Sequence, residues 1–115
     1  MQIAAPPGCE DEARRFFGEL LGLPELEKPE LLRARGGAWF AVGDRQLHVG
    51  VEDPFTPSRK AHPAFRVSAD DLDRLAARLE SAGERTEWDE SLPGARRFYT
   101  ADPWGNRLEI LAPAG

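Results

Sequence analysis

The chain has 115 residues, of which 41% are hydrophobic and 30% are charged, a composition typical of one globular domain. Acidic residues outnumber Lys and Arg by 20 to 15, and the net charge of -5 disfavours a nucleic-acid partner. Its apolar runs are too short for a membrane span or a secretory signal, and the only cysteine, Cys9, excludes an intramolecular disulfide. We therefore expect a cytoplasmic protein without nucleic-acid or membrane partners.

In the first half of the chain, a short strand at 2–5 precedes a helix at 10–21. The helix is predicted from apolar residues at helical spacing and from three acidic residues in its first turn. Gly22 ends the helix, and residues 23–29 form a loop. Turns that contain glycine then separate three predicted strands, at 31–35, 38–42 and 46–52.

The second half repeats this order of elements after a linker that contains two prolines. A strand is predicted at 62–68, followed by a helix that Asp70 or Asp71 caps and that Gly83 ends. The apolar residues of this helix keep the helical interval, at Leu72, Leu75, Ala76 and Leu79. Three further strands are predicted, at 85–88, 96–101 and 107–111.

Each half therefore has the order βαβββ, which predicts an α+β fold built from two modules in a single domain. Module one comprises residues 1–53, the linker residues 54–60, and module two residues 61–115. Neither module is large enough to bury a sheet face and a helix alone. The two modules should therefore pack together or pair with another subunit.

The last two predicted strands are joined by the turn Asp102-Pro103-Trp104-Gly105-Asn106, in which proline and glycine favour a tight connection. In the strand that follows, Glu109 lies between Leu108 and Ile110, on the opposite face of a two-residue period. A carboxylate in an otherwise apolar strand must be solvated, paired or bound to a metal, because desolvating it alone is costly. The alternative to a functional role is a solvated glutamate on an edge strand.

Together these features resemble the vicinal oxygen chelate superfamily, which contains glyoxalase I, extradiol dioxygenases, fosfomycin-modifying enzymes and bleomycin-resistance proteins. The resemblance runs over nearly the full chain. It rests on the paired βαβββ units, the helix end Phe16-Phe17 to Leu20-Leu21-Gly22, the segment Ala61-His62-Pro63-Ala64-Phe65-Arg66-Val67, and the final turn before Leu108-Glu109. It implies a cupped mixed sheet formed by both modules, with the helices on the convex side.

In the enzymes of that family, a divalent metal sits in the cupped sheet, held by the first and last strands of each half. Carried over to this chain, the resemblance implies metal ligands at His62 and Glu109 in module two and at His48 in module one. The fourth ligand is Gln2 if no residues are inserted after it. If Pro6-Pro7-Gly8 contains a two-residue insertion, this ligand precedes Met1.

Strand parity gives a check that does not depend on the family. His48, His62 and Glu109 each alternate with apolar neighbours, and each lies on the face away from the helix-covered core. Two imidazoles, a carboxylate and an amide or water suit Ni, Mn, Fe, Co or Zn, with open positions for a chelating substrate. The metal would act as a Lewis acid and Glu109 as the catalytic base. For each histidine, a hydrogen-bonded sheet histidine is the alternative.

Three residues on the same faces are candidates for binding an anionic or phenolic substrate, namely Arg66, Arg97 and Tyr99. For the two arginines, solvated surface charges are the alternative.

We expect a small metal-dependent lyase, isomerase or dioxygenase-type enzyme that acts on a small oxygen-chelating substrate. The alternative is a non-catalytic drug- or small-molecule-binding protein of the bleomycin-resistance type, in which an acidic groove suits a cationic drug without a metal. A third possibility is a purely structural member of the family. The strand edges left by a cupped sheet favour a homodimer.

Overall fold

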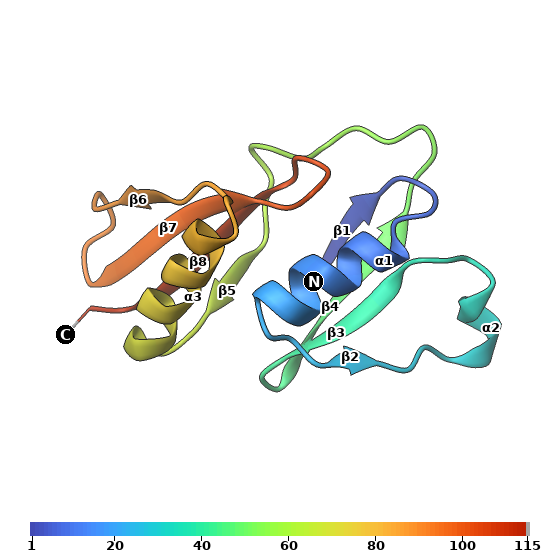
Figure 1. The fold of residues 1–115 in the computed structure, drawn as a ribbon, viewed down its shortest axis with the longest axis horizontal. Coiled ribbons are helices and arrows are strands. Elements are labelled where there is room, and N and C mark those ends of the chain that lie inside the picture. Colours follow the sequence, from blue (N-terminus) through green and yellow to red (C-terminus); the bar gives the residue numbers. More distant parts are fainter. Residues whose placement is uncertain (115) are drawn as a thin grey trace.

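The computed structural model describes residues 1–114 and contains two βαβββ modules (Figure 1). The elements of module one are β1 (Gln2–Ala5), α1 (Glu10–Ala13), η1 (Arg14–Leu20), β2 (Glu25–Leu26), α2 (Glu30–Arg33), β3 (Ala38–Val42) and β4 (Arg45–Val51). Those of module two are β5 (Ala64–Arg66), α3 (Ala69–Ser81), β6 (Glu87–Asp89), β7 (Ala95–Ala101) and β8 (Arg107–Pro113).

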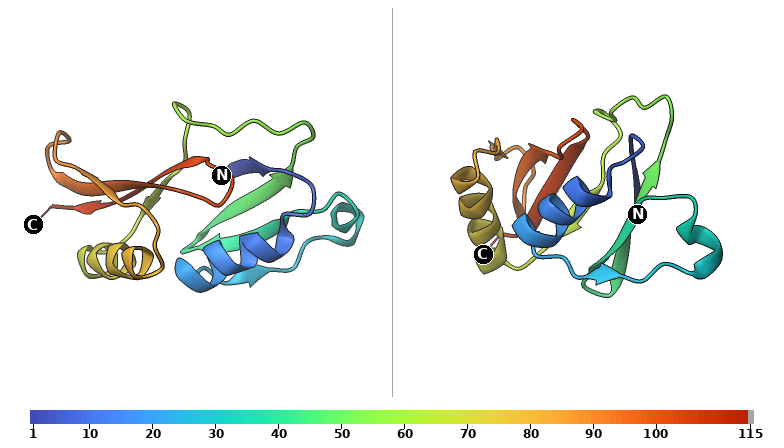
Figure 2. Two further views of the ribbon diagram at one scale, coloured as in Figure 1. Left: turned by 45° about the horizontal axis from the view of Figure 1, so that its top comes forward. Right: turned by 45° about the vertical axis from the view of Figure 1, so that its right-hand side comes forward.

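Each module forms its own four-stranded mixed sheet, and the two sheets have the same topology. The strand order is β1-β4-β3-β2 in module one and β5-β8-β7-β6 in module two. In each sheet the first strand pairs in parallel with the last strand, and the other pairs are antiparallel. The left view of Figure 2 shows both main helices below the two sheets, which leaves the opposite faces free of helices. The predicted α+β class and the repeat are confirmed, with the sheet divided into two halves.

Local sequence explains both main helices. Ser68 caps α3, because its hydroxyl accepts a hydrogen bond from the backbone N–H of Asp71 at 3.1 Å, and the apolar stripe of the helix is buried. The predicted first helix is continuous but widens at Arg14, so that the N–H of Leu21 donates to the carbonyl of Phe16, five residues earlier.

The predicted strand at 31–35 is wrong. Residues 30–33 form the short helix α2, and the edge strand of the sheet is β2, inside the segment that the sequence assigned to a loop. The leucine pattern was misleading because Leu31 is 91% exposed and contributes nothing to the core. A two-residue edge strand, in turn, is too short to show a period of its own.

Other strand limits shift by a few residues. β5 spans only Ala64–Arg66, so His62 precedes the strand on which the sequence placed it. β6 begins two residues later than predicted, and β8 continues to Pro113.

One cluster of buried side chains draws on both modules. Its largest members that are fully buried are Phe16, Phe17, Phe40, Phe98, Leu47, Leu72, Leu79 and Leu108. The ring of Phe17 lies 5.7 Å from that of Phe40 in β3 and 6.5 Å from that of Trp104 in the turn between β7 and β8. Module two thus contacts the helix of module one through an aromatic side chain.

The turn between β7 and β8 also joins the modules through hydrogen bonds. Asn106 is 1% exposed, and its amide group donates to the carbonyl of Ala4 in β1 and to Oδ2 of Asp102, both at 2.7 Å. Its Oδ1 accepts from the backbone N–H of Ser58 in the linker at 2.9 Å. Burial raises the pKa of Asp102, whose other oxygen accepts from the N–H groups of Trp104 and Asn106. The turn is therefore a structural clasp between module two, β1 and the linker.

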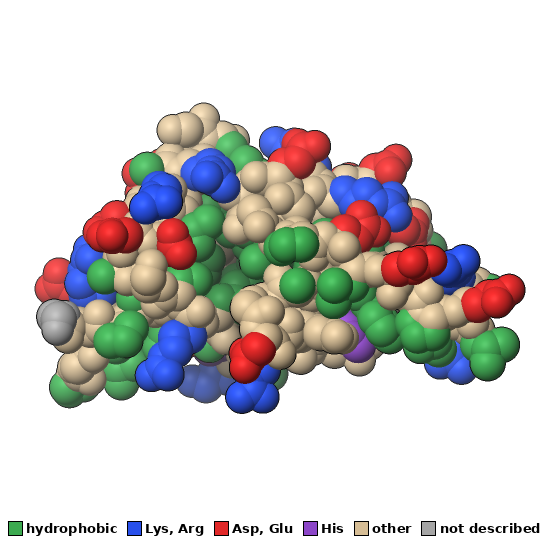
Figure 3. Space-filling view, turned by 90° about the horizontal axis from the view of Figure 1, so that it is seen from below, with side chains coloured by type: hydrophobic (Ala, Val, Ile, Leu, Met, Phe, Trp, Pro, Cys, Tyr) green, Lys and Arg blue, Asp and Glu red, His purple; other side chains and the backbone are tan. Residues whose placement is uncertain are grey.

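The molecular surface mixes charges of both signs. On the face seen in Figure 3, acidic and basic side chains alternate around groups of hydrophobic ones, and no single charge dominates. Within residues 1–114, no helix has the length and apolar character that a membrane crossing requires.

Candidate active site

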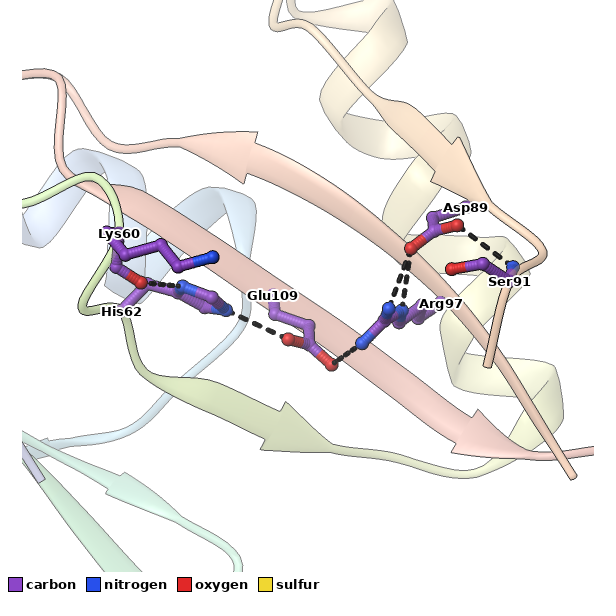
Figure 4. Close-up of polar contacts among 6 residues, drawn as sticks. All are labelled: Lys60, His62, Asp89, Ser91, Arg97 and Glu109. Atoms are coloured by element: carbon purple, nitrogen blue, oxygen red, sulfur yellow. Dashed lines mark hydrogen bonds and ion pairs between the residues drawn. The ribbon is translucent and has the colours of Figure 1, made fainter. Parts of the chain in front are cut away.

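Glu109 is at the centre of a polar cluster on the sheet of module two (Figure 4). It lies on β8, one of the two inner strands of this sheet, with Ala64 of β5 and Tyr99 of β7 as its register partners. The residue is only 7% exposed, so its charge requires partners. Its two carboxylate oxygens have one partner each, which are His62 and Arg97.

His62 is oriented by two oxygens. Its Nε2 lies 2.9 Å from Oε1 of Glu109, and its Nδ1 lies 2.8 Å from the backbone carbonyl of Lys60. A carbonyl oxygen only accepts, so Nδ1 carries a proton, and a neutral imidazole then has no proton left for Nε2. The contact with Glu109 therefore needs a second proton or a cation in its place.

Arg97 is held between two carboxylates. Its Nη1 donates to Oε2 of Glu109 at 3.2 Å, while Nε and Nη2 donate to Oδ2 of Asp89 at 3.1 and 2.7 Å. The hydrogen bond to Asp89 raises the pKa of Arg97. The guanidinium predicted to bind substrate is thus engaged within the protein, where it fixes the orientation of Glu109.

Asp89 is a member of the cluster that sequence reasoning missed. Its pKa is lowered to about 2, first by hydrogen bonds from Ser91 and then by Arg97. Asp89 and Arg97 are register partners of β6 and β7. This pairing could have revealed Asp89, but the strand predicted at 85–88 ends one residue before it, and its register with the strand at 96–101 was not predicted.

Tyr99 adjoins this cluster and a cavity, whereas Arg66 stays apart. The ring of Tyr99 meets the ring of His62 edge-on at 5.5 Å, and the guanidinium of Arg107 lies 4.0 Å from the centre of the tyrosine ring. Tyr99 also lines a cavity of about 450 Å³. Arg66 is exposed at the end of β5.

His48 occupies the corresponding place in module one but has different surroundings. Its ring stacks on that of Trp39, with 3.7 Å between the ring centres and 1° between the planes, and its Nε2 lies 2.9 Å from Oε1 of Gln46. Burial lowers the pKa of His48, and the positive charges of the chain's amino terminus and Lys28 lower it further. This environment favours the neutral imidazole.

Three of the four predicted metal ligands line two cavities, and Glu109 lines neither of them. His48 and Gln2 line one of about 380 Å³, and Gln2 and His62 line another of about 510 Å³. Among the described residues, no group of three or more His, Cys, Asp or Glu side chains could hold a metal ion. The structure brings His62 and Glu109 together and leaves His48 apart.

The repeat also shows which residue of module two is the counterpart of Gln2. Gln2 pairs with His48 in the same way that Ala64 pairs with Glu109. By position in the repeat, Gln2 is therefore the counterpart of Ala64, whereas His62 precedes Ala64 by two residues.

Comparison with known proteins establishes the family. A model of the Glyoxalase/Bleomycin resistance protein/Dioxygenase superfamily matches residues 4–110. The chain belongs to this superfamily. A crystal structure from Bacillus anthracis that is assigned to the glyoxalase family has a TM-score of 0.93 with 45% identity, covering 98% of this chain and 91% of that one.

One relative of this glyoxalase-superfamily chain and one structural neighbour have names that refer to functions of their own. Glutathione transferase FosA of Serratia marcescens is 34% identical over 102 residues, which cover 83% of this chain and 67% of FosA. The structure of the fosfomycin resistance protein FosX of Listeria monocytogenes matches with a TM-score of 0.76, over 99% of this chain and 90% of the FosX chain. At 14% identity, this match shows the fold alone.

The donor atoms of module two fit the metal that the superfamily resemblance implies. Metal-bound histidines commonly donate their other ring N–H to a backbone carbonyl, as His62 does to Lys60. Two ligands about 2.1 Å from one ion at a right angle lie about 3 Å apart, and His62 Nε2 and Glu109 Oε1 are separated by 2.9 Å. A cation bound by both atoms would also remove the need for a second proton at this contact. The pair can therefore supply two ligands of a metal site.

Proposed function

We propose that this chain is a small metal-dependent enzyme of the glyoxalase type, a lyase, isomerase or dioxygenase-type catalyst for a small oxygen-bearing substrate. His62 and Glu109 would hold the ion, and Gln2 is the polar side chain of module one that lines a cavity together with His62. The observation that carries the proposal is His62, whose two ring nitrogens face a carbonyl and a carboxylate oxygen.

The bound metal would supply a Lewis acid for a carbonyl or alkoxide oxygen of the substrate. The other tasks belong to the chain itself. Arg97 keeps one oxygen of Glu109 fixed, so that the carboxylate faces His62 with the other. Glu109 is the candidate base, and a proton taken from the substrate would reside on Oε1, the oxygen that faces His62, while Oε2 stays with Arg97. The low exposure of Glu109 keeps this proton away from bulk water.

Metal binding by protein freed of metal with a chelator tests the proposal. Equilibrium dialysis against Mn, Ni, Co or Zn should give about one ion per chain, and the bound metal should raise the melting temperature. His62→Ala and the isosteric Glu109→Gln should each weaken metal binding by more than the roughly 10- to 100-fold loss that is typical when only the hydrogen-bond partner of a ligand is removed. His48→Ala is the matched control, because it removes a histidine from β4, the strand of module one that is equivalent to β8. Absence of binding, or equal loss in His48→Ala, would overturn the metal assignment.

The names of the relatives suggest first substrates. Fosfomycin with glutathione as co-substrate is the natural starting assay, since FosA is called a glutathione transferase and FosX a fosfomycin resistance protein. Metal-loaded wild type should consume fosfomycin, and Glu109→Gln should lower the rate about 100-fold or more. Should this pair not react, 2-oxoaldehyde adducts of glutathione and catechols cover the other reactions of the superfamily.

One observation favours a second function, a non-catalytic small-molecule-binding protein. Both oxygens of Glu109 already have partners, so the cluster is satisfied by the protein alone if His62 is protonated. The arginines around Tyr99 argue against the cationic ligand expected from the net charge. A metal-free protein that binds a small molecule without converting it would identify this function.

We also propose that the chain acts as a single glyoxalase-like domain and forms a homodimer. The outer strands β1, β2, β5 and β6 leave one edge each unpaired within the described chain. Light scattering during size-exclusion chromatography should give twice the 12.7 kDa mass of the chain. A monomer mass at micromolar concentration would contradict the dimer.

A further inference from the structure

The cavity beside Tyr99 is lined by three arginines that the sequence analysis did not select. Glu87 is the first residue of β6 and Arg85 precedes it by two residues, whereas Arg107 begins β8 and Arg59 comes from the linker. Three segments far apart in sequence thus place cationic side chains around one space of about 450 Å³.

These arginines have no carboxylate within ion-pair distance among residues 1–114, in contrast to Arg97, which contacts two. In a chain with 20 acidic and 15 basic residues, such a cluster is unlike the average surface. The cavity contains one carboxylate, Glu87. Three positive charges against one negative charge leave a surplus of two.

The position of the cluster is fixed by its neighbours. The guanidinium of Arg107 lies over the ring of Tyr99, and its backbone N–H donates to the carbonyl of Ser58 at 2.8 Å, which also holds the linker segment that carries Arg59. The clasp at Asn106 adds the hydrogen bond to the N–H of Ser58. The cavity is therefore built on the turn and the linker, not on freely mobile side chains alone.

Tyr99 connects this cavity with the proposed metal site. Its ring contacts His62 edge-on, and Tyr99 is the register partner of Glu109. A ligand held at the arginines would therefore extend past Tyr99 toward the two residues at which the reaction is proposed.

We propose that this cavity binds the negatively charged end of the substrate, a phosphate or phosphonate group. Guanidinium groups recognise such oxyanions through paired charge-assisted hydrogen bonds, and a dianion matches the surplus of two positive charges. That this anion is part of the substrate rests on the proposed function. Binding of the anion itself needs no metal.

The test is titration calorimetry of the metal-free wild-type chain with inorganic phosphate and methylphosphonate, at constant ionic strength. Both dianions should bind, and acetate should bind more weakly. Arg107→Gln and Arg85→Gln should each weaken binding about tenfold or more. In the described chain the cation–π partners of Tyr99 are Arg97 and Arg107 and not Arg85, so the Arg85 variant is a second test that leaves the stacking on this ring intact. If acetate binds more strongly than either dianion, the cavity is a carboxylate site and the proposal of a phosphate or phosphonate site is wrong.

Arg35→Gln is the matched control, since Arg35 is an arginine without an ion pair in the described chain and lines the cavity of module one. It should bind phosphate as wild type does, and equal loss in this variant or no binding by wild type would overturn the proposal. Two measurements distinguish a failure of the anion proposal from a failure of the metal proposal. Arg107→Gln should retain metal binding, and His62→Ala should retain phosphate binding.

Discussion

The two modules share topology and register, yet they present different chemistry at the same place. Each has a central strand whose polar residue pairs with the first strand on one side and with an aromatic residue on the other. These sets are Gln2, His48 and Trp39 in module one, and Ala64, Glu109 and Tyr99 in module two. In module one the polar residue is a stacked imidazole, whereas in module two it is a carboxylate between a histidine and an arginine.

This difference shows how a repeated scaffold can carry a single site. The sheet supplies the position in both halves, but a charge at that position persists only where neighbours neutralise it. In module two, Asp89 and Arg97 provide that support from β6 and β7. In module one, the aromatic ring of Trp39 covers His48, and burial lowers its pKa. The chemistry was therefore decided by the residues around the equivalent positions.

The largest effect is expected from the core, where the modules are alike. Phe40 and Phe98 stand in equivalent strands, are both 0% exposed and belong to one cluster. Phe40→Ala and Phe98→Ala should each lower the free energy of unfolding by about 3–5 kcal/mol, because each leaves a cavity. Urea unfolding followed by tryptophan fluorescence should show one transition for both. Two separate transitions would mean that the modules unfold independently.

An intermediate effect is expected from cutting the clasp between the modules. Asn106→Ala removes hydrogen bonds to Ala4, Ser58 and Asp102 and leaves buried groups unpaired. The free energy of unfolding should fall by about 3 kcal/mol. Thr86→Ala removes an exposed hydrogen bond to Glu80 and should cost less than about 0.5 kcal/mol. Comparable losses in chemical denaturation of the two variants would refute the role of Asn106.

The smallest effect is expected at Asp89, and it depends on pH. Folding lowers the pKa of Asp89 from 3.8 to about 2, so the charged form is favoured in the folded state. Its stabilisation is complete above about pH 4 and is lost as the pH falls through about 2. Asp89→Asn should therefore be less stable than wild type at pH 6, and the difference should shrink in this acidic range. Glu90→Gln, which removes a carboxylate without an ion pair in the described chain, should show no such trend in melting temperature.

Periodicity predicted the elements where one face of a helix or strand is buried over several residues. The helix predicted from the apolar residues Leu72 to Leu79, the strands at 38–42 and 46–52, and the final strand around Glu109 all correspond to observed elements. The method failed at 31–35, where the leucines are not in the core, and at the two-residue strand β2. An apolar residue type indicates only that burial is favourable, and the packing of the rest of the fold decides whether that residue is buried.

By itself, the sequence determined the repeated order of elements, although with one strand of module one misplaced, the tight turn before β8 and the alternation that isolates Glu109 among apolar neighbours. These features are local, because each depends on residues within one helix, strand or turn. Only the tertiary structure decided that His62 meets Glu109, that Asp89 supports Arg97, that His48 lies apart, and that three arginines surround Tyr99. Such contacts depend on strand register and on packing between distant segments, which a pattern along the chain does not encode.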